Sequence, residues 1–386
     1  MRLQDLFQAY FDARRHKRRS ASALRFEMHY ERNLFTLYEE IISGRYRISP
    51  SVCFISFRPV QREVFAADFR DRIVHHLLYN YINPVFERLF VSDCYSCRKG
   101  KGTLYGIRRA DHFIRSCSEN YTRDCYVLKL DIQGYFMAID RRLLFDKVQR
   151  VVRRYCKDIP SDCELLLQLL HQVIFHDPTA HCQVRGRRED WAGLPKSKSL
   201  FFARPNSGLP IGNLTSQLFG NVYLNEFDHW MKCKLQCRSY GRYVDDIFVV
   251  HRERGFLKAL IPTVGKYLRG TLALELHERK LYLQHFRKGM PFLGAVIKPY
   301  RLYIGRRTKA SFFRSIQKWN AFLSECKGQP TRENMQAFLC SVNAYLGAMK
   351  HFRTYKLRRK LLTNVLTKRW MVYSRIAPAY NTITSI

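Results

Sequence analysis

The sequence predicts an α+β fold with helices toward both ends of the chain and β-strands between them. Apolar residues recur every four positions along the segment 70–90, which is the spacing of one helix face. Two apolar runs rich in β-forming residues, 125–132 and 241–250, are typical of strands instead. Apolar residues at helical spacing appear again after about residue 305. This order of elements favours a helix-flanked sheet.

The elements follow one another without a low-complexity linker or a repeat. Residues 1 to about 120 are expected to be largely helical, and a strand is expected at Cys125–Ile132. A helix is expected after Asn213, and strand-like alternation appears near Arg301–Ile304. The apolar positions of the expected helices are Ile73, Leu77, Tyr81 and Val85; Leu214, Leu218 and Val222; Phe312, Ile316, Trp319 and Leu323; and Met335, Leu339, Val342 and Leu346.

Composition points to a folded, strongly basic protein. The 386 residues are 46% hydrophobic, which is enough for a substantial core. Lys and Arg number 67 against 32 acids, so the expected partner is a polyanion, either nucleic acid or an acidic membrane surface. No apolar run of about 18 residues predicts a membrane-spanning helix. Charged residues stand where a signal peptide would be apolar, so a cytoplasmic protein with no membrane partner is expected.

Twelve cysteines are scattered along the chain. Without a secretory signal, reduced thiols are favoured over disulfides. Cys94 and Cys97 form a C-x-x-C pair, and Cys233 and Cys237 lie one residue further apart. A zinc site built from these four is the alternative to ordinary buried or half-buried thiols, which are the favoured interpretation.

The basic charge is concentrated near the C-terminal end. From Lys298 to Arg369 the sequence has 17 Lys and Arg but only two acids, Glu325 and Glu333. A charge run is usually only a solvated face. An imbalance of this size over several helices is better explained by contact with a phosphate backbone.

Two carboxylates interrupt an apolar segment, GRYVDDIFVV, at Asp245 and Asp246. Paired carboxylates repel each other, so the pattern asks for a cation. Interpreted as a hairpin, one strand ends at Tyr243 and Val244, the next runs from Ile247 to Val250, and the Asp pair forms the turn. On its own, a surface turn is the favoured interpretation of two adjacent aspartates.

A third carboxylate, Asp131, ends the other strand-like run in LKLDIQGYF. If the two segments are neighbours, three carboxylates converge and suit two Mg²⁺ ions about 3.5–4 Å apart. Hard oxygen ligands match Mg²⁺ better than zinc. One ion would activate an attacking hydroxyl, and the other would hold triphosphate oxygens and the leaving pyrophosphate.

A glycine-rich loop, GLPIG, leads from Gly208 into the expected helix after Asn213. Glycines let a backbone approach a ligand closely, and a helix start presents N–H groups to it. Together with the two acidic segments, this loop forms a three-part pattern.

The three parts, in this order and spacing, resemble motifs A, B and C of reverse transcriptases. Most bacterial members have Q-G-x-x-x-S-P in motif B, whereas this chain has I-G-N-L-T-S-Q. That variant is similar to the reverse transcriptases of diversity-generating retroelements, as are DFRDRIVHHLLYNYI, YSCRKGKGT and YLGAMKHFRTYKLRRKLL. The resemblance extends from about residue 30 to 370.

The resemblance implies a right-hand polymerase with helical fingers, an antiparallel-sheet palm and a helical thumb. The expected ranges are 1–120 for the fingers with an N-terminal extension, 121–295 for the palm with a finger insertion at about 150–207, and 296–386 for the thumb.

It also implies roles for individual residues. Asp131, Asp245 and Asp246, with the Ile132 carbonyl, would hold two Mg²⁺ ions, with Mn²⁺ as an alternative. Lys280 would act as general acid, a solvated lysine being the alternative. Phe136 would be the steric gate against a 2′-OH, an ordinary core aromatic being the alternative. The implied nucleotide-binding residues are Arg62, Arg70, Gln133, Gly134, Tyr135, Phe136, Ile211 and Gly212; those for template and primer are Arg98, Lys99, Lys101, Gln217, Phe292, Leu293 and Gly294.

The implied function is RNA-directed DNA synthesis in a bacterial or phage-infected cell. The polymerase would copy a template-repeat RNA into cDNA with errors at adenines, driving mutagenic retrohoming and sequence diversification. Its partners would be that RNA, the RNA/cDNA duplex, deoxynucleoside triphosphates and a small basic pentameric accessory variability protein. The alternatives are a retron-, intron- or defence-type reverse transcriptase and a non-catalytic RNA-binding protein.

Overall fold

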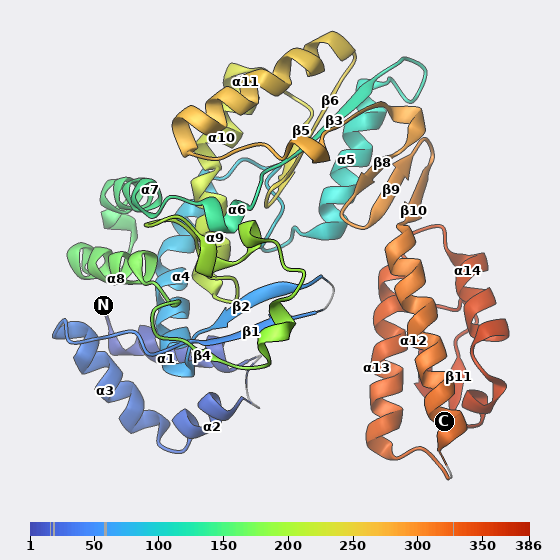
Figure 1. The fold of residues 1–386 in the computed structure, drawn as a ribbon, viewed down its shortest axis with the longest axis horizontal. Coiled ribbons are helices and arrows are strands. Elements are labelled where there is room, and N and C mark those ends of the chain that lie inside the picture. Colours follow the sequence, from blue (N-terminus) through green and yellow to red (C-terminus); the bar gives the residue numbers. More distant parts are fainter. Residues whose placement is uncertain (16, 18–19, 58–59, 327) are drawn as a thin grey trace. The chain divides into compact units, whose positions relative to one another are not determined.

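The structure, a computed structural model, describes residues 1–15, 17, 20–57, 60–326 and 328–386. The chain forms two compact units (Figure 1). The first contains Met1–Gly102, Leu128–Val249 and Arg254–Leu283, and the second contains Thr103–Val127, Val250–Glu253 and Gln284–Ile386. No helix in the described parts of the chain is both long and apolar enough to cross a lipid bilayer.

The first unit begins with helices that pack around α4 (Phe69–Leu89). Asp68 caps α4 by accepting a hydrogen bond from the Arg70 N–H at 3.1 Å. The helix predicted in this segment is confirmed, and its four predicted apolar positions are all buried. The preceding helices are α1 (Leu3–Arg14), α2 (Ala21–Glu27) and α3 (Tyr30–Ile42).

A β-hairpin lies in the region that was expected to be largely helical. Strands β1 (Val52–Ser56) and β2 (Arg62–Ala66) pair antiparallel, and β4 (Gln183–Val184) adds to β1 in parallel. Buried and half-buried side chains alternate along β1, which is the period of two that a strand requires. The expectation of a largely helical region did not include this hairpin, because its runs are short and stand between long helical segments.

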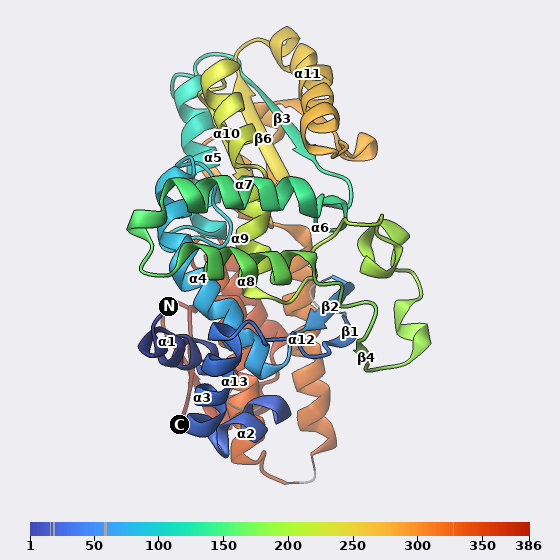
Figure 2. The same ribbon diagram turned by 90° about the vertical axis from the view of Figure 1, so that its left-hand side faces the viewer.

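A four-stranded sheet has the order β5-β6-β3-β7. Its strands are β3 (Tyr126–Asp131), β5 (Tyr240–Tyr243), β6 (Asp246–His251) and β7 (Tyr282–His285). The predicted strand at 125–132 is therefore confirmed. Helices α9 (Leu214–Tyr223), α10 (Asn225–His229) and α11 (Arg254–Leu272) lie near this sheet (Figures 1 and 2). Helix α9 begins after Asn213, as the sequence predicts.

Two helices that lie between β3 and α9 in the sequence pack side by side in the first unit. They are α7 (Arg141–Arg154) and α8 (Cys163–Phe175), and Figure 2 shows them one above the other. Each begins after an aspartate, Asp140 or Asp162, whose carboxylate accepts a hydrogen bond from a first-turn N–H. The short helix α6 (Tyr135–Ala138) precedes them.

The second unit joins α5 (Thr103–Cys117) and a small sheet to a helical C-terminal part. The sheet has the order β10-β9-β8, with β8 (Met290–Phe292), β9 (Ala295–Lys298) and β10 (Arg301–Ile304), and β10 confirms the predicted alternation. Helices α12 (Arg306–Glu325) and α13 (Arg332–Met349) pack together and confirm the predicted helical return. The chain ends in α14 (Tyr355–Lys360), β11 (Ser374–Ile376) and β12 (Ile383–Ser385).

Both predicted stripes of the C-terminal helices contribute to one core. Phe312, Ile316 and Leu323 of α12 are buried with Val342 and Leu346 of α13. The other predicted positions, Trp319, Met335 and Leu339, are partly buried against them. The mixture of helices and antiparallel strands in the two units confirms the predicted α+β class.

Candidate functional site

The structure brings the three predicted carboxylates to one end of the β5-β6-β3-β7 sheet. Asp131 is the last residue of β3, and Asp246 is the first residue of the neighbouring strand β6. Asp245 immediately precedes Asp246 in the hairpin turn. We call Asp131, Asp245 and Asp246 the carboxylate cluster.

The hairpin differs by one residue from the predicted one. Tyr243 of β5 pairs with Asp246 of β6, so the turn consists of Val244 and Asp245. Val244 has a φ of 57°, which is rare for a β-branched residue. The tight register forces this conformation, because a two-residue hairpin turn needs positive φ in at least its first position.

Two lysines pair with the cluster. The Nζ atom of Lys280 lies 2.9 and 3.0 Å from the two carboxylate oxygens of Asp131. The Nζ atom of Lys129 lies 3.1 Å from Oδ1 of Asp246. Lys280 therefore pairs with the cluster while 48% of its side chain stays exposed. Lys129 was missed from the sequence, although its position two residues before Asp131 on a strand places both side chains on one face.

The electrostatics of the cluster disfavour its charged form in the absence of added cations. Burial, followed by the charge of Asp131 and then that of Asp246, raises the pKa of Asp245 to about 6. Burial also raises the pKa of Asp246, while the Lys129 ammonium opposes that rise. Relief of this repulsion is the gain that a bound cation would supply.

The residues of the cluster fit a divalent cation in their chemistry. They offer hard carboxylate oxygens, and their mutual repulsion falls when positive charge is added. Within the described ranges, however, no group of three or more His, Cys, Asp or Glu side chains is arranged to hold a metal ion. The same finding covers the cysteine pairs considered for zinc, and all twelve cysteines are free thiols.

The raised pKa of Asp245 predicts a pH-dependent stability effect. Since the folded pKa of about 6 exceeds the unfolded value of 3.8, the protonated carboxyl favours folding below about pH 4. This contribution is lost as the pH rises through 6. In EDTA, Asp245→Asn should therefore have a higher melting temperature than wild type at pH 7.5, with the difference vanishing near pH 4. Thermal unfolding across this range measures it, and a difference that is independent of pH would contradict it.

The Ile132 carbonyl, predicted as a metal ligand, follows directly after β3. Ile132 forms an antiparallel bridge with Leu276, in which the Gln133 N–H donates to the Glu275 carbonyl at 2.8 Å. The His277 N–H donates to the Asp131 carbonyl, also at 2.8 Å. In such a bridge the central residue's own N–H and C=O point away from the partner segment. The carbonyl of Ile132 is therefore not used in this bridge.

The predicted steric gate and the motif B isoleucine share one apolar cluster. Phe136 and Ile211 are partly buried against a core of Cys53, Phe65, Met137 and Leu200. Gly220 of α9 lies close to the Phe136 ring. A Cβ atom at position 220 would be only 3.2 Å from Cε1 of Phe136. Tyr135, by contrast, is buried and donates its hydroxyl to the Gly220 carbonyl.

The loop residue Gly212 needs to be glycine for two reasons. Its φ is 131°, and a Cβ atom would lie 2.6 Å from the Phe65 carbonyl oxygen. The Phe65 N–H in turn donates to the Ile211 carbonyl at 2.8 Å. The loop is thereby fixed to strand β2. Gly134 has a similar constraint, since its φ is 54° and a Cβ atom there would lie 2.5 Å from the Ser197 carbonyl oxygen.

The two arginines predicted to bind triphosphate have different surroundings. Arg62 is exposed at the start of β2. Arg70 is half-buried, pairs with Glu40 through both terminal nitrogens, and lies over the Tyr46 ring at 5.3 Å. Gln133, also predicted at the nucleotide, is exposed beside the cluster. Arg62 and Gln133 are therefore more accessible to a ligand than Arg70 is.

The predicted template loop divides into buried and exposed members. The Arg98 guanidinium pairs with Glu87 at 2.9 Å and donates to the Val91 and Cys94 carbonyls, and its side chain is only 6% exposed. It therefore stabilises the end of α4 and, contrary to the expectation, does not present its charge at the surface. Lys99 is exposed, while Lys101 is half-buried and donates to the Ser92 carbonyl.

The remaining predicted residues lie on α9 and on the β8–β9 hairpin. Gln217 is exposed on α9. Phe292 is buried, and Leu293 and Gly294 form the hairpin turn with φ values of 48° and 80°. Two positive φ values in succession are typical of a type I′ turn. The hairpin belongs to the second unit.

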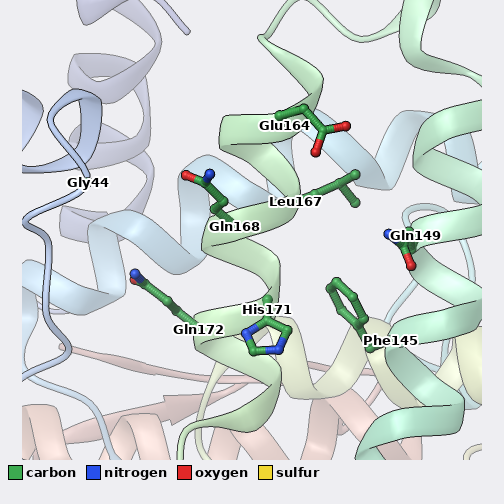
Figure 3. Close-up of a pocket in the computed structure, with 8 residues that line it drawn as sticks. All are labelled: Gly44, Phe145, Gln149, Glu164, Leu167, Gln168, His171 and Gln172. Carbon is green, nitrogen blue, oxygen red and sulfur yellow. The ribbon is translucent and has the colours of Figure 1, made fainter.

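A pocket in the first unit is separate from these residues. It has a volume of about 360 Å³ and lies between α7, α8 and Gly44 (Figure 3). Phe145 and His171 meet edge to face in its lining, with ring centroids 5.1 Å apart. None of the predicted site residues lines it, so it does not extend the carboxylate cluster.

Comparison with known proteins gives one family match. Residues 57–297 match the family described as "Reverse transcriptase (RNA-dependent DNA polymerase)". Protein YkfC of Escherichia coli (strain K12) is 25% identical over 292 residues, which are 67% of this chain and 69% of YkfC. The matched family range includes all three cluster carboxylates.

Solved telomerase structures are more distantly similar. Apo telomerase from Candida tropicalis, truncated from its C-terminal domain, has 12% identity and a TM-score of 0.47, with 70% of this chain and 59% of that chain covered. Telomerase from Candida albicans, in complex with the TWJ fragment of telomeric RNA, has 12% identity and a TM-score of 0.43, with 85% and 63% covered. The chain thus spans less than two thirds of either telomerase chain.

Proposed function

The chain belongs to the reverse transcriptase family of RNA-directed DNA polymerases, which are nucleotidyltransferases, and we propose that the carboxylate cluster is its catalytic centre. Family membership confirms the predicted right-hand polymerase fold. Fingers, palm and thumb are proposed at 1–120, 121–295 and 296–386. The observation that supports the proposal most is the meeting of Asp131 with Asp245 and Asp246 at the end of one sheet.

Asp131, Asp245 and the Ile132 carbonyl would hold two divalent ions, with Asp246 beside them. We propose Mg²⁺ in this role, with Mn²⁺ as a substitute. When bound, the ions supply charge stabilisation to the attacking and leaving oxygens of the transferred phosphoryl group. The three carboxylates themselves would bind these ions and orient them.

Lys280 and Lys129 hold positive charge at the cluster. Their ammonium groups offset part of the repulsion among the carboxylates, as the distances of 2.9 Å to Asp131 and 3.1 Å to Asp246 indicate. Lys280 is the more exposed, with 48% of its side chain accessible, and can therefore turn toward a leaving pyrophosphate. We propose that it donates a proton there.

The incoming deoxynucleotide would lie between the cluster and the motif B loop. Phe136 and Ile211 present an apolar surface, Gly212 holds the motif B loop close to Phe65, and Arg62 would reach phosphate oxygens. Lys99 and Gln217 are exposed and would contact the template. The hairpin at Phe292–Gly294 would hold the primer end.

The second unit supplies basic surface for the RNA/cDNA duplex. Arg359 and Lys360 of α14 are exposed and suit phosphate contacts. Arg358 does not, since it is buried and donates to the Ala379 and Tyr380 carbonyls at 3.1 and 2.8 Å. Arg358 therefore stabilises the C-terminal segment, whereas Arg359 and Lys360 stay available for phosphate contacts.

Within the family, we propose the diversity-generating subtype. The enzyme would copy a template-repeat RNA in the cytoplasm with errors at adenines, aided by a basic pentameric accessory protein. Support comes from I-G-N-L-T-S-Q, in which Ile211 replaces a glutamine. Ile211 offers no hydrogen-bond donor or acceptor from its side chain, and its neighbours Phe65 and Phe136 are apolar too.

An Ile211→Gln variant tests the subtype. A polar site that checks hydrogen bonds discriminates far better than an apolar one of similar size. We expect the variant to make severalfold fewer errors at template adenines, while errors at other bases change less. Sequencing cDNA copied from one RNA template by both proteins measures this.

Two outcomes would contradict the proposal. An unchanged adenine error rate in an active variant would exclude Ile211 as a main source of infidelity. Wild-type cDNA with no excess of adenine errors would instead favour a retron-, intron- or defence-type enzyme. Ile211→Leu is the matched control, because it keeps an apolar side chain of the same size in the same cluster.

A further inference from the structure

A fully buried ion pair lies beneath the turn that carries Asp245. Arg242 and Asp228 are both 0% exposed, and the guanidinium meets the carboxylate through two bonds, Nε to Oδ1 at 2.7 Å and Nη2 to Oδ2 at 2.5 Å. Tyr240 also donates its hydroxyl to Asp228. A bidentate pair of this kind has a fixed orientation. The position of the third guanidinium nitrogen, Nη1, is therefore fixed as well.

That third nitrogen is directed at the catalytic turn. Nη1 of Arg242 donates to the Val244 carbonyl at 2.9 Å. On the other side of the same residue, the Val244 N–H donates to Oγ of Ser96 at 3.2 Å. Both backbone polar groups of a β-branched residue with a φ of 57° are thus held by buried side chains. A strained conformation persists only when its surroundings determine it in this way.

The two holding groups are themselves linked. Oγ of Ser96 donates to Oδ1 of Asn221 at 2.9 Å, and Nδ2 of Asn221 donates to the Ser96 carbonyl at 2.8 Å. Arg242 also bridges to the segment before Ser96, since its N–H donates to the Asp93 carbonyl and its carbonyl accepts from Tyr95. We call Ser96, Asn221, Asp228 and Arg242 the turn clamp. It ties the turn to helices α9 and α10.

We propose that the turn clamp positions the Asp245 carboxylate for metal binding, with Arg242 as its central positioning residue. Asp245 follows Val244 directly, so the orientation of the Val244–Asp245 peptide decides where its side chain points. A buried ion pair is seldom needed for stability, because well-packed apolar residues of the same size serve equally well. Its contact with the Val244 carbonyl, next to Asp245, agrees with a positioning role. The inference rests on the proposed role of Asp245 as a metal ligand.

Two variants release the turn from opposite sides. Arg242→Lys keeps a positive charge near Asp228 but lacks the planar fork that reaches Val244. Ser96→Ala removes the acceptor of the Val244 N–H together with the bond from Oγ to Oδ1 of Asn221. It is the milder change because it leaves the Arg242–Asp228 pair intact. Ser118→Ala is the matched control, because the buried Ser118 Oγ likewise accepts the N–H of a residue with positive φ, Tyr121 at φ 73°, over 3.0 Å.

The experiment measures Mn²⁺ affinity by electron paramagnetic resonance, the single-turnover rate of primer extension, and the melting temperature. Outer-shell groups of metal sites typically contribute 10- to 100-fold to affinity or activity. We expect Ser96→Ala and Arg242→Lys to weaken Mn²⁺ binding and slow extension by about tenfold or more. Ser118→Ala should keep both within about twofold of wild type, whatever its melting temperature.

Three results would overturn the proposal. Ser96→Ala with wild-type Mn²⁺ affinity and rate would do so, even if Arg242→Lys failed to fold. Equal losses in Ser118→Ala would reduce the effect to general destabilisation. Wild-type protein that extends primers but has no Mn²⁺ binding dependent on Asp245 would overturn the metal assignment of Asp245 itself. Only this last result also contradicts the proposed function.

Discussion

Replacing Asp245 by Asn should reduce nucleotide addition by roughly a thousandfold. Metal-assisted stabilisation of a phosphoryl transition state is worth several kcal/mol, and each 1.4 kcal/mol is about tenfold in rate. The side chain is nearly isosteric, and the neutral amide relieves the repulsion that raises the pKa of Asp245. The fold and the affinity for RNA should therefore persist.

Primer extension on an RNA template with and without Mg²⁺ measures the loss, and filter binding measures the affinity for RNA. Asp71→Asn is the matched control. Burial raises the pKa of Asp71 to about 6 as well, but this carboxylate lies on α4, outside the cluster, and accepts hydrogen bonds from Tyr46 and Ser49. Polymerisation by Asp245→Asn above a few per cent of wild type would exclude Asp245 as an essential ligand.

The elements that the sequence predicted well are those with long, regular apolar patterns. Helix α4 has 21 residues, so a stripe four residues apart is repeated often enough to be unambiguous. Helices α12 and α13 were predictable for the same reason. The β1–β2 hairpin was not, because each strand has five residues and depends on the pairing with its partner.

Side-chain roles were less predictable than elements. Arg98 and Arg358 belong to basic runs, yet each turns inward to backbone carbonyls that only the folded chain brings near. Lys129 pairs with Asp246 across two strands separated by more than a hundred residues in sequence. Local sequence indicates which side chains carry charge, whereas tertiary contacts decide which of those charges face a ligand.

Asp131, Asp245 and Lys280 were nevertheless named as site residues from the sequence, and Lys280 lies beside Asp131 in the structure. Here the constraint comes from chemistry as well as folding, because paired carboxylates in apolar strands are stable only beside positive charge. The turn clamp shows the opposite case. Arg242 stands in the GRYVDDIFVV segment and Asp228 lies on α10, but nothing in their spacing showed that a guanidinium would reach the Val244 carbonyl.

The second prediction concerns the sugar of the incoming nucleotide. Phe136 is only partly buried, although it borders a core that contains Met137 and Leu200. A residue whose only task was packing would gain from complete burial, since each buried CH₂ contributes about 0.8 kcal/mol. The partial exposure of the ring, five residues after Asp131 and against Gly220, agrees with a surface that a substrate completes.

Replacing Phe136 by Ala should raise incorporation of ribonucleotides relative to deoxynucleotides by roughly tenfold to a hundredfold, the range in which apolar pockets discriminate small groups. The smaller side chain leaves room for a 2′-OH. Steady-state kinetics with matched ribo- and deoxynucleotides gives the ratio of kcat/KM values. Met137→Ala removes apolar atoms from the same cluster and should leave this ratio unchanged while lowering stability, because Met137 is buried. If Phe136→Ala stays active with an unchanged ratio, Phe136 serves packing alone, and selection against ribonucleotides lies elsewhere in the site.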